Sequence, residues 1–158
     1  MNELKIRAAQ EFDAEELTQL AMRSKAVWGY DETFMASCKD ELSLSSSQIN
    51  SELSICFTAL VNSKLVGFYL VTQQTSLSEE AELEALFVEP EFLGHGIGKK
   101  LFDHIICQCQ QKGINKLHIQ ADPNAEAFYL KVGAELIGKT ASMSIKDRYL
   151  PQFVYNLT

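Results

Sequence analysis

Long apolar runs and a surplus of basic residues are both missing from the sequence, and each absence excludes a class of protein. The chain of 158 residues opens with MNELKIRAAQ, where Glu3, Lys5 and Arg7 break up the apolar stretch that a secretory signal needs. No later run reaches the ~18 apolar residues of a membrane-spanning helix. The net charge of −7 contrasts with the basic stripe by which nucleic-acid-binding proteins replace counterions. We therefore expect a cytoplasmic protein that binds neither membranes nor nucleic acids.

The sequence also lacks the spacings of a metal site. The four cysteines do not form the CxxC pattern of a zinc or redox site, and Cys107 and Cys109 stand two positions apart in a helical pattern, where side chains diverge. The three histidines show no metal-ligand spacing. We expect reduced thiols and no bound metal.

Length and apolar content favour one domain over residues 1–158. Domains most often have about 100–150 residues, and 46% apolar side chains are enough for a single core. No internal repeat is found, and the short serine-rich stretch at residues 43–48 is typical of a loop with helix-capping hydroxyls.

Hydrophobic periodicity predicts alternating strands and helices. Strands are predicted at residues 4–9, 55–61, 65–73, 81–90, 116–121, 134–139 and 152–157, and helices at residues 13–29, 32–42, 96–113 and 124–132. Asp13 and Asn124 are the expected caps of their helices. The helix at 96–113 requires a right-handed parallel crossover, whereas the short turn at 62–64 predicts an antiparallel hairpin. The predicted fold class is α/β, with a mixed, mostly antiparallel sheet of about seven strands and about four helices.

Three glycines in five positions, GHGIG at residues 94–98, stand between an apolar strand and a helix. A phosphate-binding P-loop ends in Gly-Lys-Ser/Thr, but Gly98 is followed by Lys99 and Lys100, and the spacing also fails the dinucleotide fingerprint GxGxxG. The glycines then serve either a tight turn with close packing of the helix on the strand or an anion seat, in which backbone N–H groups converge at the positive end of the helix. Lys99 and Lys100 favour the anion, because a cation in the first helical turn is unfavourable by a few tenths of a kcal/mol unless an anion lies nearby.

A longer stretch around these glycines resembles a known family. LFVEPEFLGHGIGKKLFDHI, followed by KLHIQADPNAEAFYLKVGAELIG, is similar to the acetyl-CoA-binding half of the GNAT acetyltransferase superfamily, whose motif is Gln/Arg-x-x-Gly-x-Gly/Ala after a strand and a Pro-bearing loop. The resemblance spans residues 80–138, and Leu93 departs from the leading Gln/Arg. It implies a single-domain GNAT fold and acetyl-CoA as the cofactor.

The resemblance also implies a set of cofactor contacts. Leu86, Phe87 and Val88 would present backbone groups to the pantetheine arm, which Asn124 would also touch. The turn around the pyrophosphate would consist of Leu93, Gly94, His95, Gly96, Ile97, Gly98 and Lys99.

Tyr129 matches the family position of a tyrosine that lies near the CoA sulfur. Acetyl transfer needs an acid for the departing thiolate, and a phenol with a pKa of about 10 can protonate a thiolate whose parent thiol has a pKa near 8.5. The alternative is that Tyr129, like its neighbour Phe128, only packs against the helix face.

The general base is expected on the strand AELEALFV. Strand alternation places Glu82 and Glu84 on one face and Leu83, Ala85 and Phe87 on the other. Either carboxylate, directly or through a water, can take a proton from an alkylammonium. Glu82 matches a strand position where many family members carry a catalytic glutamate, and Glu84 is the second candidate. The alternatives are two solvated carboxylates and deprotonation through ordered water alone.

Acceptor contacts are expected from outside the cofactor motif. Trp28 and Tyr30 end the first helix with two aromatics that can form one wall of a pocket and hold a cation against a ring face, although core packing also explains Trp28. Arg148 lies in a predicted loop, where it either binds a carboxylate in a bidentate manner or is a surface residue.

The combined reading is an acetyl-CoA-dependent N-acetyltransferase that acts on a primary amine of a small molecule by direct attack in a ternary complex. One alternative is acetylation of a protein or peptide at an N-terminus or a lysine, and another is a CoA-binding sensor module without turnover. Many relatives form homodimers, but no sequence feature decides the oligomeric state.

Overall fold

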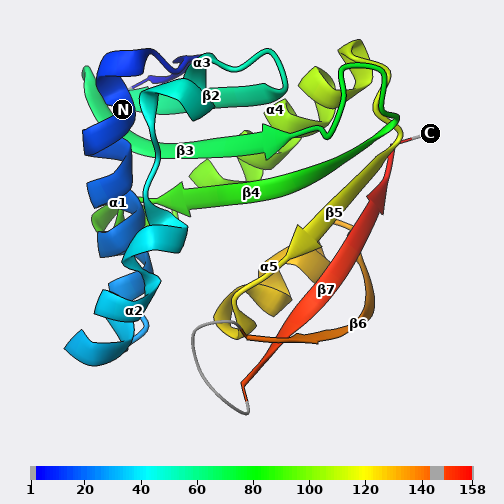
Figure 1. Ribbon diagram of the computed structural model, residues 1–158. Coiled ribbons are helices and arrows are strands. Elements are labelled where there is room, and N and C mark those ends of the chain that lie inside the picture. The colour runs from blue at the N-terminus through cyan, green and yellow to red at the C-terminus, as the bar shows by residue number, and fades with distance from the viewer. Residues whose placement is uncertain (1–2, 143–147, 158) are drawn as a thin grey trace.

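A computed structural model of the chain describes residues 3–142 and 148–157. In these residues one seven-stranded sheet has the strand order β1-β2-β3-β4-β5-β7-β6 (Figure 1). Its strands are β1 (Leu4–Ala8), β2 (Ser54–Val61), β3 (Lys64–Thr72), β4 (Glu80–Val88), β5 (Lys116–Gln120), β6 (Glu135–Ala141) and β7 (Tyr149–Asn156). β4 and β5 are parallel, and all the other neighbouring pairs are antiparallel. The mixed, mostly antiparallel sheet predicted from the sequence is confirmed.

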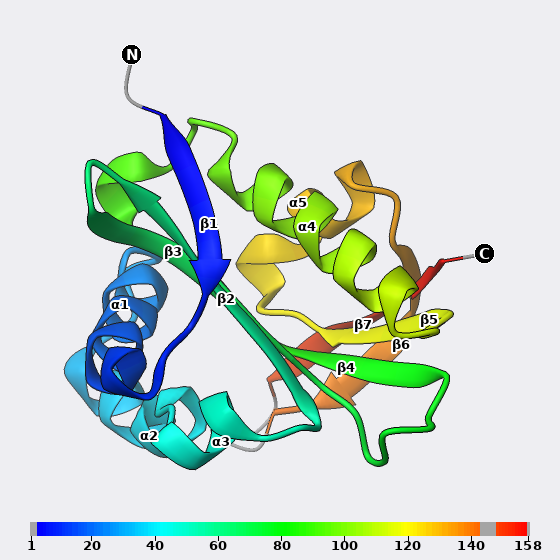
Figure 2. The same ribbon diagram turned by 90° about the horizontal axis from the view of Figure 1, so that it is seen from above.

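Helices cover both faces of this sheet. The α-helices are α1 (Ala14–Ala26), α2 (Glu32–Leu42), α3 (Ser46–Asn50), α4 (Ile97–Gln111) and α5 (Glu126–Lys131), with 3₁₀ turns η1 (Glu11–Asp13), η2 (Pro90–Phe92) and η3 (Pro123–Ala125). Figure 2 shows α1, α2 and α3 on one side of the sheet and α4 and α5 on the other. Two buried clusters follow from this layering, one beneath α4 and one beneath α1 and α2. No helix in the described part of the chain is long and apolar enough to cross a membrane.

Local turn chemistry explains the β2–β3 hairpin. Asn62 and Ser63 both have positive φ, at 52° and 67°, as a two-residue type I′ turn requires. The register then pairs Val61 with Lys64 and continues to Ser54 and Thr72. The hairpin predicted from the short polar turn is confirmed.

Two predicted helix caps are wrong, because nearby groups compete for the same side chains. The Asp13 carboxylate accepts hydrogen bonds from both terminal nitrogens of Arg7, at 2.8 and 3.1 Å, and does not cap α1. Asn124 lies inside η3, where its backbone N–H donates to the carboxylate of Asp122 at 2.9 Å. Asp122 is therefore the residue that caps this turn.

A β-bulge in β4 changes the predicted alternation. The β3–β4 register shifts between Ala85 and Leu83, which leaves Glu84 as an extra residue. Leu83 consequently packs in the cluster beneath α4, while Ala85 and Phe87 pack in the cluster beneath α1 and α2. The prediction that these three apolar side chains share one face is wrong for this reason.

β4 and β5 separate partway along their length. Their pairing runs from Glu80 and Lys116 to Leu83 and Ile119, after which the two strands diverge (Figure 1). Beyond this point β4 continues beside β3, and β5 continues beside β7. The chain enters α4 from the end of β4 and reaches α5 from the end of β5, so both helices begin near the separation.

A buried hydrogen bond joins the sheet to α4. The hydroxyl of Tyr69, which is fully buried on β3, lies 2.8 Å from Nδ1 of His104 on α4. Burial lowers the pKa of His104, because the charged imidazolium loses hydration. The folded protein therefore favours the neutral ring.

Folding stability should fall between pH 7.5 and pH 5.5 through His104. The pKa of His104 is lower in the folded chain than in the unfolded chain, where it is about 6.5. As the pH falls through about 6.5, the unfolded chain binds more protons than the folded chain. The folding stability that is present above this pH is therefore lost. Urea unfolding of His104→Gln should show a weaker loss than the wild type over this interval. His95→Gln is the control and should keep the wild-type pH dependence; equal slopes for both variants would contradict the prediction.

Candidate functional site

The glycine turn before α4 needs glycine for conformational reasons. Gly94 and Gly96 have φ values of +83° and +77°, in the left-handed region that other residues rarely adopt. A Cβ built on either residue meets no atom of the described chain within 4 Å. The turn is therefore both tight and open on its outer side.

The amides of this turn are free to bind a ligand. The first N–H of α4 that reaches a backbone carbonyl is that of Lys100, which donates to Gly96 at 3.1 Å. From Gly94 to Lys99, no amide donates to a backbone carbonyl of the described residues. Unpaired N–H groups at the positive end of a 15-residue helix favour an anion. The anion seat predicted from the glycines is thus physically available.

Gly98 serves close packing. A Cβ at this position would lie 3.2 Å from the ring of Phe128 on α5. The absence of a side chain therefore lets the first turn of α4 lie directly against α5, which is a helix-to-helix contact and not the helix-to-strand packing considered from the sequence. Lys99 forms an exposed ion pair with Asp103 at 3.2 Å, which partly offsets its unfavourable position in the first turn.

An ion pair between the half-exposed Arg23 and the buried Glu89 anchors the segment between β4 and the turn. Glu89 accepts two hydrogen bonds of 2.8 Å from Nε and a terminal nitrogen of Arg23 on α1, and its N–H donates to Val66 at 2.7 Å. The hydrogen bonds from Arg23 hold the pKa of Glu89 below its usual value despite burial. The pair fixes the approach to the turn relative to α1. Sequence reasoning missed both residues, since they lie 66 positions apart.

Leu86, Phe87 and Val88 occupy the part of β4 that has separated from β5. Pairing with β5 ends at Leu83, so these residues have no backbone partner on β5. Leu86 and Val88 pack beneath α4, and Phe87 packs beneath α1 and α2. An extended ligand can therefore meet unpaired backbone groups along this edge.

Tyr129 lies on α5 with its ring in the core. The ring centroid lies 5.1 Å from that of Phe128, 5.6 Å from that of Phe153 and 6.3 Å from that of Phe102. The hydroxyl has no hydrogen-bond partner among the described residues, and burial raises the pKa of Tyr129. Ring packing and an available proton are thus combined in one side chain.

Glu82 and Glu84 line a common hollow on the sheet face away from α4. The hollow has a volume of about 300 Å³ and also includes Thr72, Glu80 and His118 in its wall. Thr72 donates to Glu84 at 2.9 Å, and a nitrogen of His118 lies 2.7 Å from Glu80. Burial raises the pKa of Glu84, and the neighbouring Glu82 adds to the rise. The structure brings the two candidate bases together.

A second group of polar residues gathers beyond the end of β5. We name it the Asp122 cluster, and it consists of Lys25, Tyr30, Asp122, Asn124 and Arg148. The Tyr30 hydroxyl donates to Asp122 at 2.9 Å and accepts from Asn124 Nδ2 at 3.0 Å and from Arg148. Arg148 also donates to Asp122 at 3.1 Å, and Lys25 Nζ lies 3.5 Å from the same carboxylate. Burial together with the hydrogen bond to Asp122 raises the pKa of Tyr30 to about 12.

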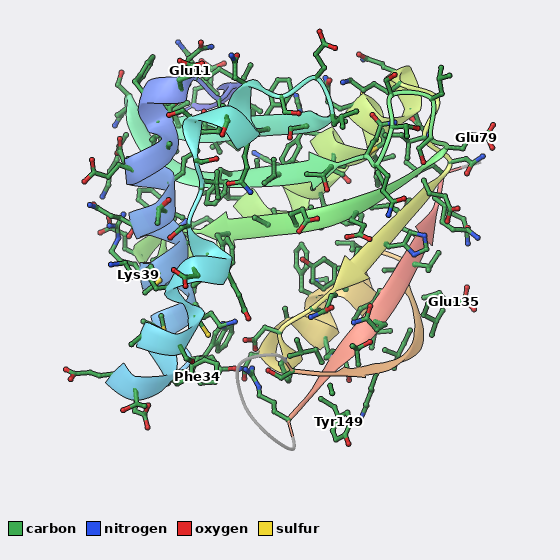
Figure 3. The ribbon with its side chains drawn as sticks, in the orientation of Figure 1. Glu11, Phe34, Lys39, Glu79, Glu135 and Tyr149 are labelled. Carbon is green, nitrogen blue, oxygen red and sulfur yellow. The ribbon has the colours of Figure 1, made fainter. Side chains whose placement is uncertain are left out.

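Aromatic rings hold the cations of this cluster. The guanidinium carbon of Arg148 lies 4.9 Å from the ring centroids of both Tyr30 and Phe34. Figure 3 shows Phe34 on the side of α2 that faces the carboxyl-terminal strands. Arg148 thus covers the ring face of Tyr30, and Asp122 is the protein carboxylate that Arg148 contacts. Trp28, in contrast, is 49% exposed and makes no ring contact in the described chain.

The roles predicted for Trp28, Tyr30 and Arg148 in acceptor binding stay predictions. The structure joins Tyr30 and Arg148 in one cluster, and Trp28 lies outside it. Sequence reasoning missed Lys25, Phe34 and Asp122. Asp122 directly precedes Pro123, which is a weak signal of a capping position.

Comparison with known proteins shows the family. A family model described as acetyltransferase (GNAT) domain matches residues 8–143. The chain belongs to the GNAT family. An uncharacterized N-acetyltransferase, ycf52 of Pyropia yezoensis, is 35% identical over 72 residues, which are 46% of this chain and 40% of that protein. This GNAT chain therefore matches less than half the length of that curated relative.

Solved structures of GNAT proteins share the fold. The PaiA N-acetyltransferase of Thermoplasma acidophilum, in complex with coenzyme A, superposes with a TM-score of 0.76 at 22% identity and covers 98% of this chain and 99% of its own. An aminoglycoside 6′-N-acetyltransferase complexed with coenzyme A gives a TM-score of 0.75 at 17% identity, covering 98% and 97%. At these identities the likeness concerns the fold, which is the single-domain GNAT architecture predicted from the sequence.

The described residues hold no group of three or more His, Cys, Asp or Glu side chains that could bind a metal ion. The site is built from backbone amides, carboxylates and aromatic hydroxyls.

Substitution of Gly96 by alanine should weaken binding of coenzyme A. The residue adopts φ +77°, and its Cβ would project into the open space beside the turn. Alanine is strained by about 1–2 kcal/mol in the left-handed region, so the free turn should relax to another conformation and regain this strain on binding, which corresponds to a loss of affinity of about 5- to 30-fold. Titration calorimetry measures the change. Gly138→Ala is the control, because its Cβ also meets open space but its φ is ordinary; an equal affinity loss there, or none at Gly96, would contradict the assignment.

Proposed function

We propose that this GNAT chain is an acetyl-CoA-dependent N-acetyltransferase that acylates a primary amine of a small molecule by direct attack in a ternary complex. The observation that carries the proposal is the turn of free amides from Gly94 to Lys99, which opens where β4 and β5 separate. Two solved structures with this fold are complexes with coenzyme A, which supports the same cofactor here.

The residues proposed to hold acetyl-CoA offer groups that match the parts of the cofactor. The turn from Gly94 to Lys99 offers unpaired N–H groups for a pyrophosphate, and the freed edge from Leu86 to Val88 suits an extended arm of amides. Asn124 uses its Nδ2 within the Asp122 cluster, which leaves its side-chain oxygen to accept a hydrogen bond from that arm. Acetyl-CoA supplies an acetyl thioester, and transfer of the acetyl group to an amine yields an amide and a free thiol.

The base role falls to the hollow that contains Glu82 and Glu84. An amine arrives as an ammonium of pKa near 10 and must lose a proton before its nitrogen can attack a carbonyl carbon. Burial gives Glu84 a raised pKa, which brings its basicity closer to that of the amine. Glu82 lies beside it and adds negative charge that attracts the ammonium. We assign Glu84 as the leading base and Glu82 as its partner, which reverses the order expected from the strand position.

The acid role falls to Tyr129. Burial raises its pKa, which keeps the phenol protonated at neutral pH. Proton transfer from the phenol to the leaving sulfur forms the free thiol and leaves a phenolate, which regains its proton from the nitrogen that becomes the amide. The hydroxyl is free of protein partners among the described residues and is available for this transfer.

Release of free CoA thiol separates the proposal from its rivals. The purified protein is given acetyl-CoA with a panel of small amines, lysine peptides and N-terminal peptides. Thiol release accelerated by small amines supports the proposal, and acceleration by peptides alone supports peptide acetylation. Tight binding of acetyl-CoA in calorimetry with no acceptor-dependent release over the whole panel would establish the sensor reading instead.

Removal of the Tyr129 hydroxyl should lower kcat while leaving cofactor affinity intact. Loss of a positioned acid typically costs about 10²- to 10⁴-fold in rate. Tyr129→Phe keeps the ring contacts with Phe128 and Phe153, so the fold and the Kd for CoA should stay unchanged. Tyr155→Phe is the matched control, because its ring packs on Phe102 at 5.3 Å outside the proposed chemistry. A kcat for Tyr129→Phe equal to that of the control would remove the acid assignment.

The pH dependence of kcat/KM should identify the base. A base acts in its deprotonated form, so the rate should rise with pH through the pKa of Glu84, which is raised by burial. Glu84→Gln should remove this rise and lower the rate at neutral pH by about 10²-fold or more. Glu82→Gln should shift the rise to lower pH, because it removes a neighbouring negative charge. Unchanged profiles in both variants would assign deprotonation to water.

A further inference from the structure

The Asp122 cluster contains more positive than negative charge. Lys25 and Arg148 each contribute a cation, and Asp122 contributes the one carboxylate of the five residues that define the cluster. The side chains of Lys25, Asp122 and Arg148 are only 15%, 16% and 16% exposed. A mostly buried cation without a counter-charge is unfavourable, because it loses hydration without gaining a partner. The surplus therefore favours an added anion.

The single carboxylate of the cluster is already saturated. Asp122 accepts hydrogen bonds from the Tyr30 hydroxyl, from the N–H and Nδ2 of Asn124, and from Arg148, at 2.9, 2.9, 2.9 and 3.1 Å. A carboxylate offers about four lone-pair positions. Lys25 is left at 3.5 Å, beyond the usual length of an N–H···O bond. Its ammonium has donors to spare for a further oxygen.

The cluster and the hollow of Glu82 and Glu84 lie on the same face of the sheet. Leu117, Ile119 and Ala121 point into the core beneath α4, so the alternate residues of the strand and its extension, His118 and Asp122, point the other way. His118 pairs in register with Glu82 and lines the hollow. Figure 2 shows this face of β5 and β7 without a covering helix in the part of the chain that is described.

The cluster and the hollow lie on opposite sides of the place where β4 and β5 separate. Glu84 follows Leu83 on β4, and Asp122 lies three residues beyond Ile119, the register partner of Leu83 on β5. Both places therefore border the opening between the two strands. One place is acidic and the other carries surplus positive charge.

We propose that the acceptor carries a carboxylate close to its reactive amine, and that Lys25 and Arg148 of the Asp122 cluster bind this carboxylate while the amine enters the hollow of Glu82 and Glu84. The acceptor class is thus an amino acid or another short aminocarboxylate. This inference rests on the proposed acetyltransferase function and names its substrate class.

A purely cationic acceptor fits the cluster less well. The ring faces of Tyr30 and Phe34 that would hold a cation are occupied by Arg148, and Lys25 Nζ lies 5.6 Å from the Phe34 ring centroid. A third cation would meet two like charges and a saturated carboxylate. A free peptide N-terminus also lacks a carboxylate beside its amine, so the inference favours small molecules over peptides.

The decisive measurement compares matched acceptors. Glycine, β-alanine, γ-aminobutyrate and phenylalanine are each paired with the same amine lacking a free carboxylate: methylamine, ethylamine, propylamine and phenylalaninamide. At least one acid should exceed its partner in kcat/KM by about tenfold or more, as a charge-assisted contact implies. That preference should shrink toward unity in Arg148→Gln and in Lys25→Gln, should be partly retained in Arg148→Lys, and should persist in the control Lys112→Gln. The inference is overturned if the acid-to-amine ratio of kcat/KM stays the same in both Gln variants. It is also overturned if the wild type prefers the amine without a carboxylate in every pair.

A binding experiment separates this inference from the proposed function. Calorimetry with the CoA-saturated protein measures the affinity of the same acids and amines without turnover, and CoA affinity in each variant verifies folding. If no acceptor is acetylated but an acid binds tightly in the wild type and weakly in Arg148→Gln, the carboxylate site stands and the acetyltransferase function fails. If amines are acetylated but the acids neither react nor bind better than their partners, the function stands and the carboxylate site is overturned. If acids neither bind nor react and no amine reacts, both are overturned.

Discussion

The loss of pairing between β4 and β5 after Leu83 and Ile119 is the constraint on which the rest of this structure depends. Two parallel strands that stayed paired would offer no unpaired backbone to a ligand, because every N–H and C=O between them would be satisfied. The bulge at Glu84 shifts β4 relative to β3 at the same point. The bulge at Glu84 therefore coincides with the free edge of β4 and with the change of the core that Leu83 and Ala85 face. It also places the Glu84 carboxylate in the hollow.

Helices cover the apolar side chains that the separation of β4 and β5 would otherwise expose. A gap in a sheet would leave apolar side chains open to water unless another layer covered them. α4 and α5 cover it on one face, and they approach closely because Gly98 has no side chain to displace Phe128. The rings of Phe102, Phe128, Tyr129 and Phe153 fill the space behind the separation. The residue proposed as the acid is thus held by the same packing that closes the sheet.

Features that depend on neighbours in the sequence were predictable, and features that depend on distant contacts were not. The hairpin at Asn62 and Ser63 and the glycine turn at Gly94 and Gly96 follow from local backbone preferences, and both are confirmed. The bulge at Glu84 was not predictable, because AELEALFV alternates regularly and the shift appears only in the register with β3. The caps assigned to Asp13 and Asn124 were wrong for a similar reason. Asp13 is bound by Arg7 from a strand, and the position before Asn124 supplied the better acceptor.

The Asp122 cluster illustrates the same limit within the site. Tyr30 and Asp122 lie 92 positions apart, and Tyr30 and Arg148 lie 118 apart. Their positions at the end of the first predicted helix and in a predicted loop made Tyr30 and Arg148 candidates for acceptor binding, but only the fold joins them and adds Lys25 and Phe34. Their hydrogen bonds connect the segment after α1, the end of β5 and the start of β7, which are the elements on either side of the separation.

The carboxyl end of α1 has a consequence for how two ligands would influence each other. Arg23 holds Glu89 on the approach to the glycine turn, and Lys25, two residues later, belongs to the Asp122 cluster. A displacement of this one helix end alters both places together. Thermodynamic reciprocity then requires that each ligand changes the affinity of the other by the same factor. The order of binding affects the kinetics but leaves the overall free energy of assembly the same.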